Sequence, residues 1–436
     1  MTTSPCTSVS FVNKSKRIRI ALVSTFHLAN NPRLVKQADA LCQAGYEVDV
    51  FATKYLDWPD AGDRSLLAGS SWSVQFVDYH PVRRTRLFWY SRVRKKLAKA
   101  VWRISSAYLP DKFVEWIAFR ALERVYPEIC ALVLKKKSDL YIAHGVAALP
   151  IAVKAAAKNQ GVAGFDFADF HPGMVDVGSE ASCEEKISLF IERRYIKKVK
   201  QFTAASPGIA DAISRFYRLP LPASVLNVFP LRQRPEALRS CSESGPITLC
   251  WFSQTIGRDR GLNDAVGACA LLPPGSVELH LRGAWAIGYE EEFKKLWQQE
   301  VGERAKLFVQ GPVPPTQLVK AVAQFDIGLA LEIPISENRL ICMRDLCTNK
   351  VFTYLLAGLA VAASGIEGCS SIFEGAGFTY PTGDPGALAS GIGQWVDNRA
   401  ALQHARSAAW RVAGTCYNWD IEQEKFIATV KEVLRN

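Results

Sequence analysis

The chain has 436 residues, of which 49% are apolar, so it can form the cores of two domains and is not intrinsically disordered. Its 11 cysteines include no Cys-x-x-Cys pair, which argues against a structural zinc site or a disulfide framework and fits a reducing cytoplasm. The polar first 17 residues make a poor signal peptide, and no apolar run approaches the ~20 residues that span a bilayer. We therefore expect a soluble or peripheral protein.

The net charge of +11 is concentrated in the first half of the chain. Residues 1–240 contain 36 Lys and Arg against 21 Asp and Glu, a balance of +15, whereas the remaining residues contain 17 against 21, a balance of −4. This asymmetry indicates an acidic partner for one domain, such as nucleic acid, anionic lipid or a phosphorylated substrate.

The first elements predict a β-α-β unit. Residues 18–23 form an apolar run typical of a buried strand, Pro32 begins a helix that stops at Gly45, and a second strand follows at 48–51. The loop before the helix has no Gly-x-Gly-x-x-Gly fingerprint, so dinucleotide binding is not supported. Arg33 stands at the helix start, beyond the carboxyl end of the first strand, where open α/β sheets usually bind ligands.

Residues 82–104 carry nine basic residues and no acidic one. Wound as a helix at ~100° per residue, they form an apolar stripe of Trp89, Val93, Leu97, Ala100, Val101 and Ile104 beside a basic stripe of Arg92, Lys95, Lys96, Lys99 and Arg103. The pattern is typical of an interfacial helix, and our hypothesis is that it docks on an anionic membrane surface. The alternative is a core-packed helix with a solvated basic edge, while no motif supports nucleic acid.

Further strands predict a doubly wound parallel sheet. They lie at residues 140–143, 164–167 and 202–205, and helical patterns follow the first and the last of them. His144 and His171 lie just past two of these strand ends, which should open onto the same side of the sheet. The alternative for each is a hydrogen-bonded loop residue.

Asp166, Asp169 and His171 are near one another in the sequence, but their spacing is not that of metal ligands. No metal site is predicted.

A polar stretch containing Pro and Ser divides the chain. We expect a Rossmann-like domain at 17–231, a linker at 232–246, a second Rossmann-like domain at 247–412 and a C-terminal helix at 413–436 that returns towards the first domain. The second domain again alternates strands and helices, so the predicted fold class is α/β, with two doubly wound domains facing across a cleft.

The most informative stretch is residues 344–364, RDLCTNKVFTYLLAGLAVAAS. Its middle predicts a buried helix ended by Gly358 in the left-handed conformation, followed at once by a buried strand. Asn349 can cap this helix, and Lys350 adds a positive charge where unpaired N–H groups and the helix dipole already favour an anion, so a diphosphate is the expected ligand. The alternative is an ordinary buried helix with an Asn cap and an exposed Lys.

This stretch resembles the donor-site segment of retaining nucleotide-sugar glycosyltransferases of the GT-B fold, in particular the large bacterial family that builds surface glycans (glycosyltransferase family 4-like). The resemblance implies that Asn349 and Lys350 bind the donor diphosphate and that Asp345 and Thr353 hold the donor ribose or sugar. The family usually has a carboxylate at the position of Thr353, where this chain offers only a hydroxyl.

Two other regions resemble the same family. The segment WFSQTIGRDRGL resembles its donor loop, which implies that Arg258 and Arg260 grip the diphosphate. The segments YIAHG and DFADFH resemble its acceptor-side strand ends, which implies catalytic roles for His144 and His171 and acceptor-side positions for Arg33 and Asp169. The chain departs from the family at Ala168 and Met174, where relatives often have acidic residues.

The resemblance implies sugar transfer, with retention, from a nucleotide diphosphate sugar to a glycan or lipid-linked acceptor in the synthesis of a surface polysaccharide or glycolipid. No metal or other cofactor is expected. The expected location is the cytoplasm or the inner face of the plasma membrane, with residues 82–104 on the anionic surface and no nucleic acid partner. Two alternatives are a non-catalytic GT-B binding protein in an assembly and a nucleotide-sugar epimerase of the same fold.

Overall fold

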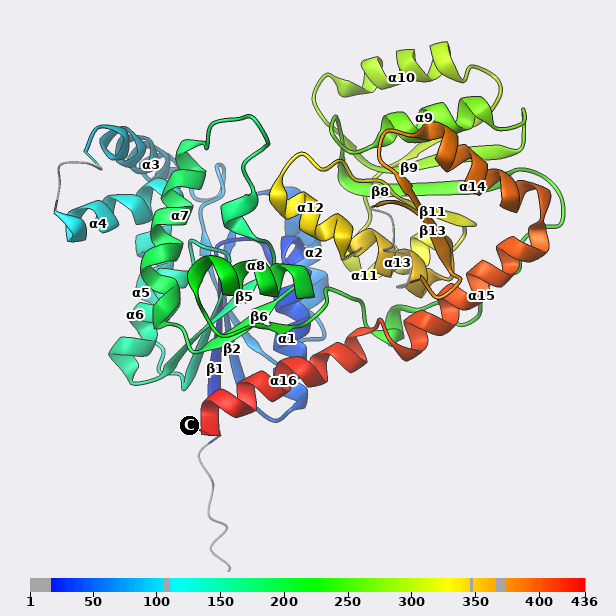
Figure 1. Cartoon of the computed structure of the whole chain (residues 1–436). Helices are drawn as coiled ribbons and strands as arrows, with labels where there is room; N and C mark the ends of the chain where they lie inside the picture. The colour runs from blue at the N-terminus through cyan, green and yellow to red at the C-terminus, as the bar shows by residue number, and fades with distance from the viewer. Residues whose placement is uncertain (1–16, 106–109, 346–347, 366–372, 436) are drawn as a thin grey trace, which may run out of the picture.

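The computed structural model describes residues 17–105, 110–345, 348–365 and 373–435, and its strands form two separate parallel sheets (Figure 1). The first sheet has the order β3-β2-β1-β4-β5-β6-β7. Its strands are β1 (Arg19–Ser24), β2 (Glu47–Lys54), β3 (Ser73–Asp78), β4 (Leu140–His144), β5 (Val162–Phe167), β6 (Gln201–Ala204) and β7 (Ala223–Ser224). All its neighbouring strands pair in parallel, which confirms the doubly wound sheet expected from the sequence.

The second sheet has six strands in the order β10-β9-β8-β11-β12-β13, again all parallel. These strands are β8 (Ile247–Ile256), β9 (Val277–Trp285), β10 (Lys306–Gln310), β11 (Ile327–Ala330), β12 (Ala360–Gly365) and β13 (Gly377–Pro381). The α/β fold class with two Rossmann-like domains is therefore confirmed.

Helices cover both sheets because parallel strands buried on two faces need a layer on each. Those before the second sheet are α1 (Pro32–Gln43), α2 (Asp57–Leu67), α3 (Thr85–Ser105), α4 (Asp111–Leu122), α5 (Tyr126–Val133), α6 (Leu149–Asn159), α7 (Cys183–Tyr195) and α8 (Pro207–Tyr217). Those that follow β8 are α9 (Leu262–Leu271), α10 (Tyr289–Glu300), α11 (Pro315–Val322), α12 (Glu337–Arg344), α13 (Asn349–Ala357), α14 (Pro385–Asp397), α15 (Arg399–Thr415) and α16 (Trp419–Arg435).

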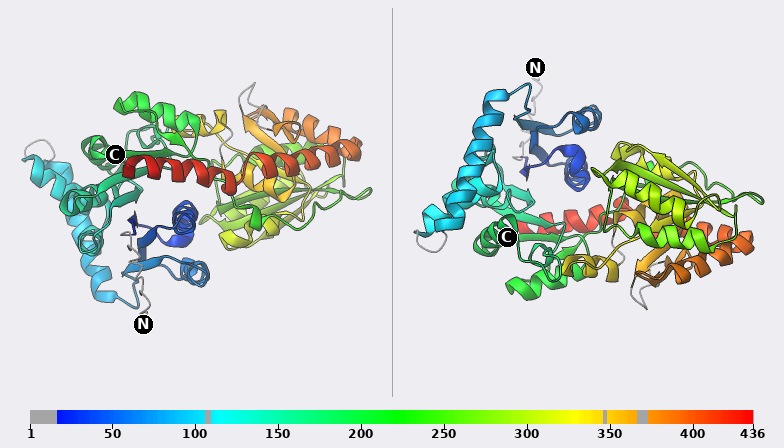
Figure 2. Two further views of the ribbon diagram at one scale, coloured as in Figure 1. Left: turned by 90° about the horizontal axis from the view of Figure 1, so that it is seen from below. Right: turned by 90° about the horizontal axis from the view of Figure 1, so that it is seen from above.

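The last helix, α16, leaves the second domain and packs on α1, β6 and β7 of the first (Figure 2). Its Glu422 accepts a hydrogen bond from the backbone N–H of Leu226 at 2.8 Å, and Thr429 accepts one from Gln201 at 3.0 Å. One apolar cluster runs from β1 and β2 through Phe229 and Phe426 to α13, so the two domains share buried surface. The exact domain boundaries stay predictions.

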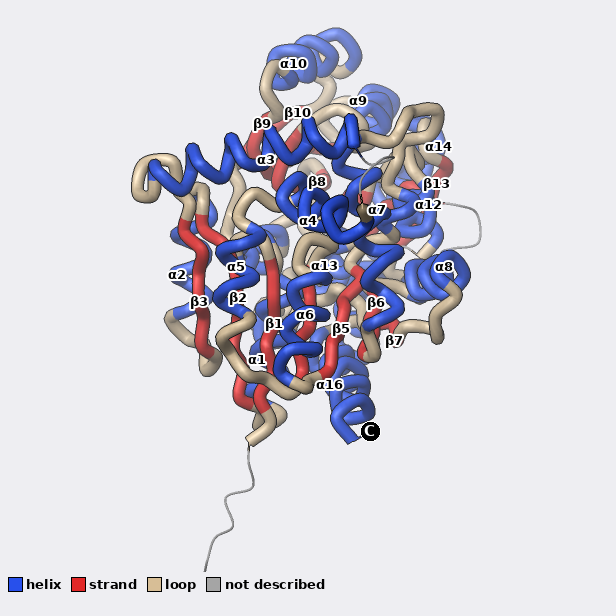
Figure 3. The backbone as a smooth tube through the Cα atoms, turned by 90° about the vertical axis from the view of Figure 1, so that its left-hand side faces the viewer, coloured by secondary structure: helices blue, strands red, loops and turns tan. Residues whose placement is uncertain are grey.

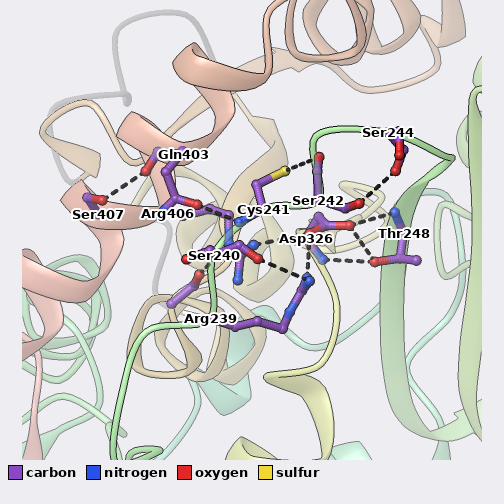
Figure 4. A network of polar contacts seen from close by, with 11 residues as sticks. Arg239, Ser240, Cys241, Ser242, Ser244, Thr248, Asp326, Gln403, Arg406 and Ser407 are labelled. Atoms are coloured by element: carbon purple, nitrogen blue, oxygen red, sulfur yellow. Dashed lines mark hydrogen bonds and ion pairs between the residues drawn. The ribbon is translucent and has the colours of Figure 1, made fainter.

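A buried polar network fixes the segment before β8 to the second domain (Figure 4). Asp326, just before β11, accepts hydrogen bonds from the side chain and the backbone N–H of Thr248 at 2.7 and 3.0 Å and from Arg406 at 3.1 Å. Arg239, from the predicted linker, reaches the same carboxylate. Burial raises the pKa of Asp326, but these donors lower it by more and leave it below its ordinary value.

Within the described residues, no helix is both long enough and apolar enough to cross a membrane.

Candidate functional site

The helix α13 begins at Asn349, and its N-cap residue is Thr348, so the expectation that Asn349 caps this helix is wrong. Asn349 lies in the first turn and is exposed, and its carbonyl oxygen accepts a hydrogen bond from Thr353 at 2.6 Å. The hydroxyl of Thr348 is buried without a hydrogen-bond partner among the described residues. Gly358 ends the helix with φ 75°, as the sequence predicts.

Close packing against the second sheet fixes the position of α13. A Cβ on Gly328 of β11 would lie 2.1 Å from the ring of Tyr354, so only glycine allows the helix to approach this strand. The Tyr354 hydroxyl donates to the carbonyl of Leu329 at 3.2 Å. The first turn of α13 is thereby held near the carboxyl end of β11.

A buried carboxylate, Glu332, gathers positive side chains at this edge of the sheet. It lies just past β11, and its Oε1 accepts a hydrogen bond from the ammonium of Lys350 at 2.7 Å. Its Oε2 accepts one from Arg339 of α12. Lys350 is itself only 8% exposed and lies 5.5 Å from the ring centroid of Trp251.

Arg260 completes this group, which we call the Glu332 cluster: Glu332, Arg260, Arg339 and Lys350. Gly261 sits at φ 72° beside it, and a Cβ there would lie 2.8 Å from the Leu331 side chain, so this turn packs directly on the segment that carries Glu332. Three cations against one carboxylate leave a formal charge of +2 in the cluster.

Burial and the neighbouring charges together shift the pKa values of Glu332 and Lys350. Burial raises the pKa of Glu332, but Lys350, Arg339 and Arg260 together bring it below its ordinary value. Burial lowers the pKa of Lys350, Glu332 restores it only in part, and Arg260 and Arg339 lower it further. A bound anion would relieve this repulsion.

The structure does not bring Arg258 into the Glu332 cluster. Its guanidinium is 59% exposed, pairs with Glu292 of α10 and lies 5.5 Å from the ring centroid of Tyr289. Thr353 is fully buried, with its hydroxyl donated to Asn349. The roles of both residues in donor binding stay predictions.

Several contacts join the second domain to the acceptor-side residues of the first. Asn338 of α12 donates to the Asp169 carboxylate at 3.0 Å and accepts from the backbone N–H of Phe170 at 2.7 Å. Asp345, at the end of the same helix, accepts from the backbone N–H of Gly208 at 2.7 Å. Because α12 also carries Arg339, one short helix connects the Glu332 cluster to the segment that contains His171.

His171 begins a short 3-10 helix (His171–Gly173), and its Nδ1 lies 3.0 Å from Glu192 Oε1 on α7. The other carboxylate oxygen of Glu192 accepts from Tyr217 at 2.7 Å. Burial lowers the pKa of His171, but the Glu192 charge outweighs it, so the net shift is upwards. The Glu192 carboxylate therefore favours the protonated form of the ring.

His144 ends β4 in a different environment. It is buried, its Nδ1 lies 3.6 Å from Asp166 Oδ2, and its Nε2 has no hydrogen-bond partner among the described residues. Asp166 accepts hydrogen bonds from Arg33 at 2.5 and 2.8 Å, while Arg33 also donates to the carbonyl of Val225 at 2.6 Å. Arg33 therefore lies in a buried ion pair. Burial raises the pKa of Asp166, but Arg33 lowers it more, to about 2.

The two histidines approach β5 from opposite faces. His144 pairs in register with Asp166, whereas the His171 ring lies 6.4 Å from that of Phe165, and adjacent residues of a strand point to opposite faces. The structure does not bring the two imidazoles together.

Acidification is expected to destabilise the protein through His144. Burial lowers its pKa from 6.5 to about 4. Between these values the unfolded chain binds the proton and the folded chain does not, so stability falls as the pH falls, by about 3 kcal/mol in total. Chemical denaturation of the wild type and of His144→Gln across this range measures the effect.

His404→Gln, at an exposed histidine, is the matched control for the removal of an imidazole. The upward shift of His171 acts in the opposite direction in both proteins, so the difference between wild type and His144→Gln isolates His144. An unchanged pH dependence in His144→Gln would contradict the assignment.

Sequence reasoning missed Glu332, Arg339 and Asn338. Glu332 directly follows an apolar strand, which is a usual ligand position, and that placement could have identified it. Arg339 and Asn338 carry no comparable local signal. No group of three or more His, Cys, Asp or Glu side chains in the described part of the chain is placed to hold a metal ion.

No protein-family model matches the chain, and no curated protein matches its sequence. Solved structures do match its fold. HepE from Anabaena, solved with UDP and glucose, is 14% identical with a TM-score of 0.63, over 95% of this chain and 100% of that one. Sucrose-phosphate synthase from Thermosynechococcus elongatus is 14% identical with a TM-score of 0.66, over 96% and 100%.

TarM of S. aureus, solved with UDP and other ligands, is 11% identical with a TM-score of 0.63, over 94% of this chain and 99% of that one. These likenesses extend over nearly the whole chain and confirm the GT-B fold.

Proposed function

We propose that this GT-B chain is a glycosyltransferase that moves a sugar from a nucleotide diphosphate sugar to a glycan or lipid-linked acceptor. The observation that carries the proposal is the Glu332 cluster. Its three cations lie at the carboxyl edge of the second sheet, the usual ligand position of an α/β domain, beside the first turn of α13. The complexes of HepE with UDP-glucose and of TarM with UDP support the same class of donor.

The chemistry requires that the negative charge of the leaving diphosphate be neutralised as the bond to the sugar breaks. In this proposal Lys350, Arg260 and Arg339 supply that charge, and the first-turn N–H groups of α13 with the free Thr348 hydroxyl supply further hydrogen bonds. Side chains rather than a metal ion then bind the diphosphate. Donor binding would draw Lys350 and Arg339 from Glu332 to the phosphate oxygens.

The proposed acceptor site lies in the first domain, on the other side of α12 from the Glu332 cluster. Asn338 of this helix holds Asp169 and the backbone N–H of Phe170, which precedes His171, so Asp169 and His171 would face the sugar bound near the Glu332 cluster. We propose transfer with retention, as the resemblance implies, and a role for His171 or His144 in binding the acceptor. The surface polysaccharide or glycolipid pathway is part of the same proposal.

We place the enzyme in the cytoplasm, peripherally attached to the inner face of the plasma membrane.

The donor site is tested by replacing Lys350 or Arg260 with alanine. Either change should weaken binding of a nucleoside diphosphate by about 1.5–3 kcal/mol, because a hydrogen bond to a charged phosphate is lost. Calorimetry after a thermal-shift screen of UDP, GDP, ADP, TDP and CMP gives the affinity. A ligand at about 100 times its dissociation constant adds ~2.7 kcal/mol to stability, which the screen detects.

Lys320→Ala, at an exposed lysine of the same domain, is the matched control and should bind like the wild type. If both Lys350→Ala and Arg260→Ala bound a nucleoside diphosphate as tightly as the wild type does, the assignment of the Glu332 cluster as the diphosphate site would be wrong.

An activity assay distinguishes a glycosyltransferase from the two alternatives, an epimerase and a non-catalytic binding protein. A transferase releases nucleotide from the donor only when an acceptor, such as a membrane extract, is present. Interconversion of the donor alone would identify an epimerase, and donor binding without either reaction would identify a binding protein. The anomeric configuration of the product, measured by NMR, decides between retention and inversion.

A further inference from the structure

The helix α3 lies on the outside of the first domain, at the end of the molecule away from the second domain. Figure 3 shows it crossing the side turned to the viewer, above the strands of the first sheet. It packs on α4, which in turn packs on α7. Its buried side consists of Ser91, Ala98 and Trp102.

The apolar stripe predicted from the sequence is the side of α3 that faces solvent. Trp89, Val93, Leu97 and Ile104 are 54%, 53%, 62% and 78% exposed, so the alternative of a stripe packed in the core is wrong. Four large apolar residues exposed along several turns of one helix form a continuous surface, and a surface of this kind is typical of a site that contacts another phase or molecule.

Charges on α3 are divided between its two sides. Towards the protein, Arg94 pairs with Glu128 of α5, and Lys99 pairs with Glu184 of α7. Outward cations flank the apolar stripe and have no ion-pair partner among the described residues: Arg86, Arg92, Lys96 and Arg103. Glu128 and Glu184 are therefore already matched to the inner cations, and the acidic residues of α4, Asp111 and Glu115, pair with Arg194 of α7. The outward cations of α3 keep their positive charge.

The neighbouring helix α4 adds aromatic surface. Phe113 and Trp116 are both about half exposed, and their rings stack at 5.8 Å. The Arg120 guanidinium lies 3.9 Å from the ring centroid of Trp116. Aromatic rings combined with basic side chains are the residues that proteins place at the boundary between headgroups and acyl chains.

We propose that the outward face of α3, with Phe113 and Trp116 of α4, docks on an anionic lipid bilayer. The apolar stripe enters the boundary between headgroups and acyl chains, and Arg86, Arg92, Lys96 and Arg103 bind lipid phosphates. The inference deepens the proposed peripheral location by naming the surface that binds the membrane. It does not depend on the proposed sugar transfer, because it concerns no step of that reaction.

Charge argues against a second copy of the chain as the partner, and the apolar stripe argues against nucleic acid. A second copy of the chain in a two-fold contact would bring the same outward cations against one another without acidic partners. Nucleic acid would match the cations, but its polar backbone would leave the apolar stripe without a partner. An anionic bilayer offers acyl chains to the apolar stripe and phosphate groups to the outward cations.

The position of α3 relates this face to the candidate site. The helix begins shortly after β3 ends at Asp78, and β3 is parallel to β4, which ends at His144. The start of α3 therefore lies at the same edge of the sheet as His144. A lipid-linked molecule in the bound leaflet would be presented at that edge.

Sedimentation with vesicles tests the proposal. The full chain should bind vesicles of phosphatidylcholine mixed with phosphatidylglycerol, bind phosphatidylcholine alone far more weakly, and be released by salt. Replacing Arg86, Arg92, Lys96 and Arg103 by glutamine should weaken binding at least about 100-fold, and Leu97→Gln with Ile104→Gln should weaken it about tenfold or more.

A matched variant changes four exposed lysines elsewhere to glutamine, Lys295, Lys306, Lys320 and Lys431, with the same loss of charge. It should bind vesicles much as the wild type does, and thermal melting and nucleoside diphosphate binding should be unchanged in all three variants. The proposal is overturned if the chain ignores anionic vesicles at low salt, or if the α3 variants bind like the control. Concentration-dependent dimerisation abolished by the Leu97 and Ile104 changes, without vesicle binding, would also overturn it.

Discussion

Replacing Asp326 with alanine is expected to lower the free energy of unfolding by about 3–5 kcal/mol, because it leaves the fully buried Arg406 without its carboxylate. The same change removes the acceptor of the Thr248 side chain and backbone N–H. The loss of its partner costs Arg239 less free energy, since its side chain is partly exposed and can hydrogen-bond to water. Urea denaturation of the purified variant gives the value.

Two further variants test whether the unpaired Arg406 charge causes the loss of unfolding free energy. Asp397→Ala, at an exposed position of α14, should change stability by no more than about 0.5 kcal/mol. Adding Arg406→Met to Asp326→Ala should recover part of the loss, because the stranded charge is then gone. An Asp326→Ala variant within about 1 kcal/mol of the wild type would contradict the interpretation. Because Asp326 precedes β11, at the opposite edge of the sheet from Glu332, nucleoside diphosphate affinity should not change.

The second large effect is expected at Asp166. Asp166→Ala leaves the buried Arg33 guanidinium unpaired and removes the acceptor of Thr203, which should destabilise the first domain by about 3–5 kcal/mol. Thermal and chemical denaturation measure this loss. It would show that Arg33 serves chiefly to join α1 to β5 and, through Val225, to the chain near β7.

Asp211→Ala is the comparison for Asp166, because Asp211 pairs with Arg215 on the surface of α8. An exposed pair of this kind contributes at most about 1 kcal/mol, and usually less. If the two variants melted alike, the buried ion pair would not be a main source of stability. If Asp166→Ala folded normally yet lost activity, Arg33 would regain its predicted place on the acceptor side.

Local patterns predicted much of the donor helix. The apolar run after Lys350, the glycine at 358 and the strand that follows correspond to α13, its left-handed end and β12. The predicted N-cap residue, Asn349, was wrong. Asn349 and Thr348 are both good N-cap residues, and the choice between them depends on where the preceding chain enters the helix.

The Glu332 cluster could not be predicted as a whole. Lys350 has a recognisable place at a helix start, but its partner Glu332 is 18 residues earlier, on a different element. Arg339 comes from α12 and Arg260 from the turn before α9. Only the parallel order of β8, β11 and β12 brings these segments to one edge of the sheet.

The sequence by itself determined the alternation of strands and helices, and hence two doubly wound domains, because buried parallel strands must be apolar throughout and the chain needs a helix to cross between them. It also determined the apolar and basic stripes of α3, which follow from helical periodicity. The tertiary structure decided which stripe faces solvent, which cations have acidic partners and which polar groups are buried. These properties depend on contacts between residues far apart in the chain, such as Lys99 with Glu184 and Arg33 with Asp166, and no local pattern records them.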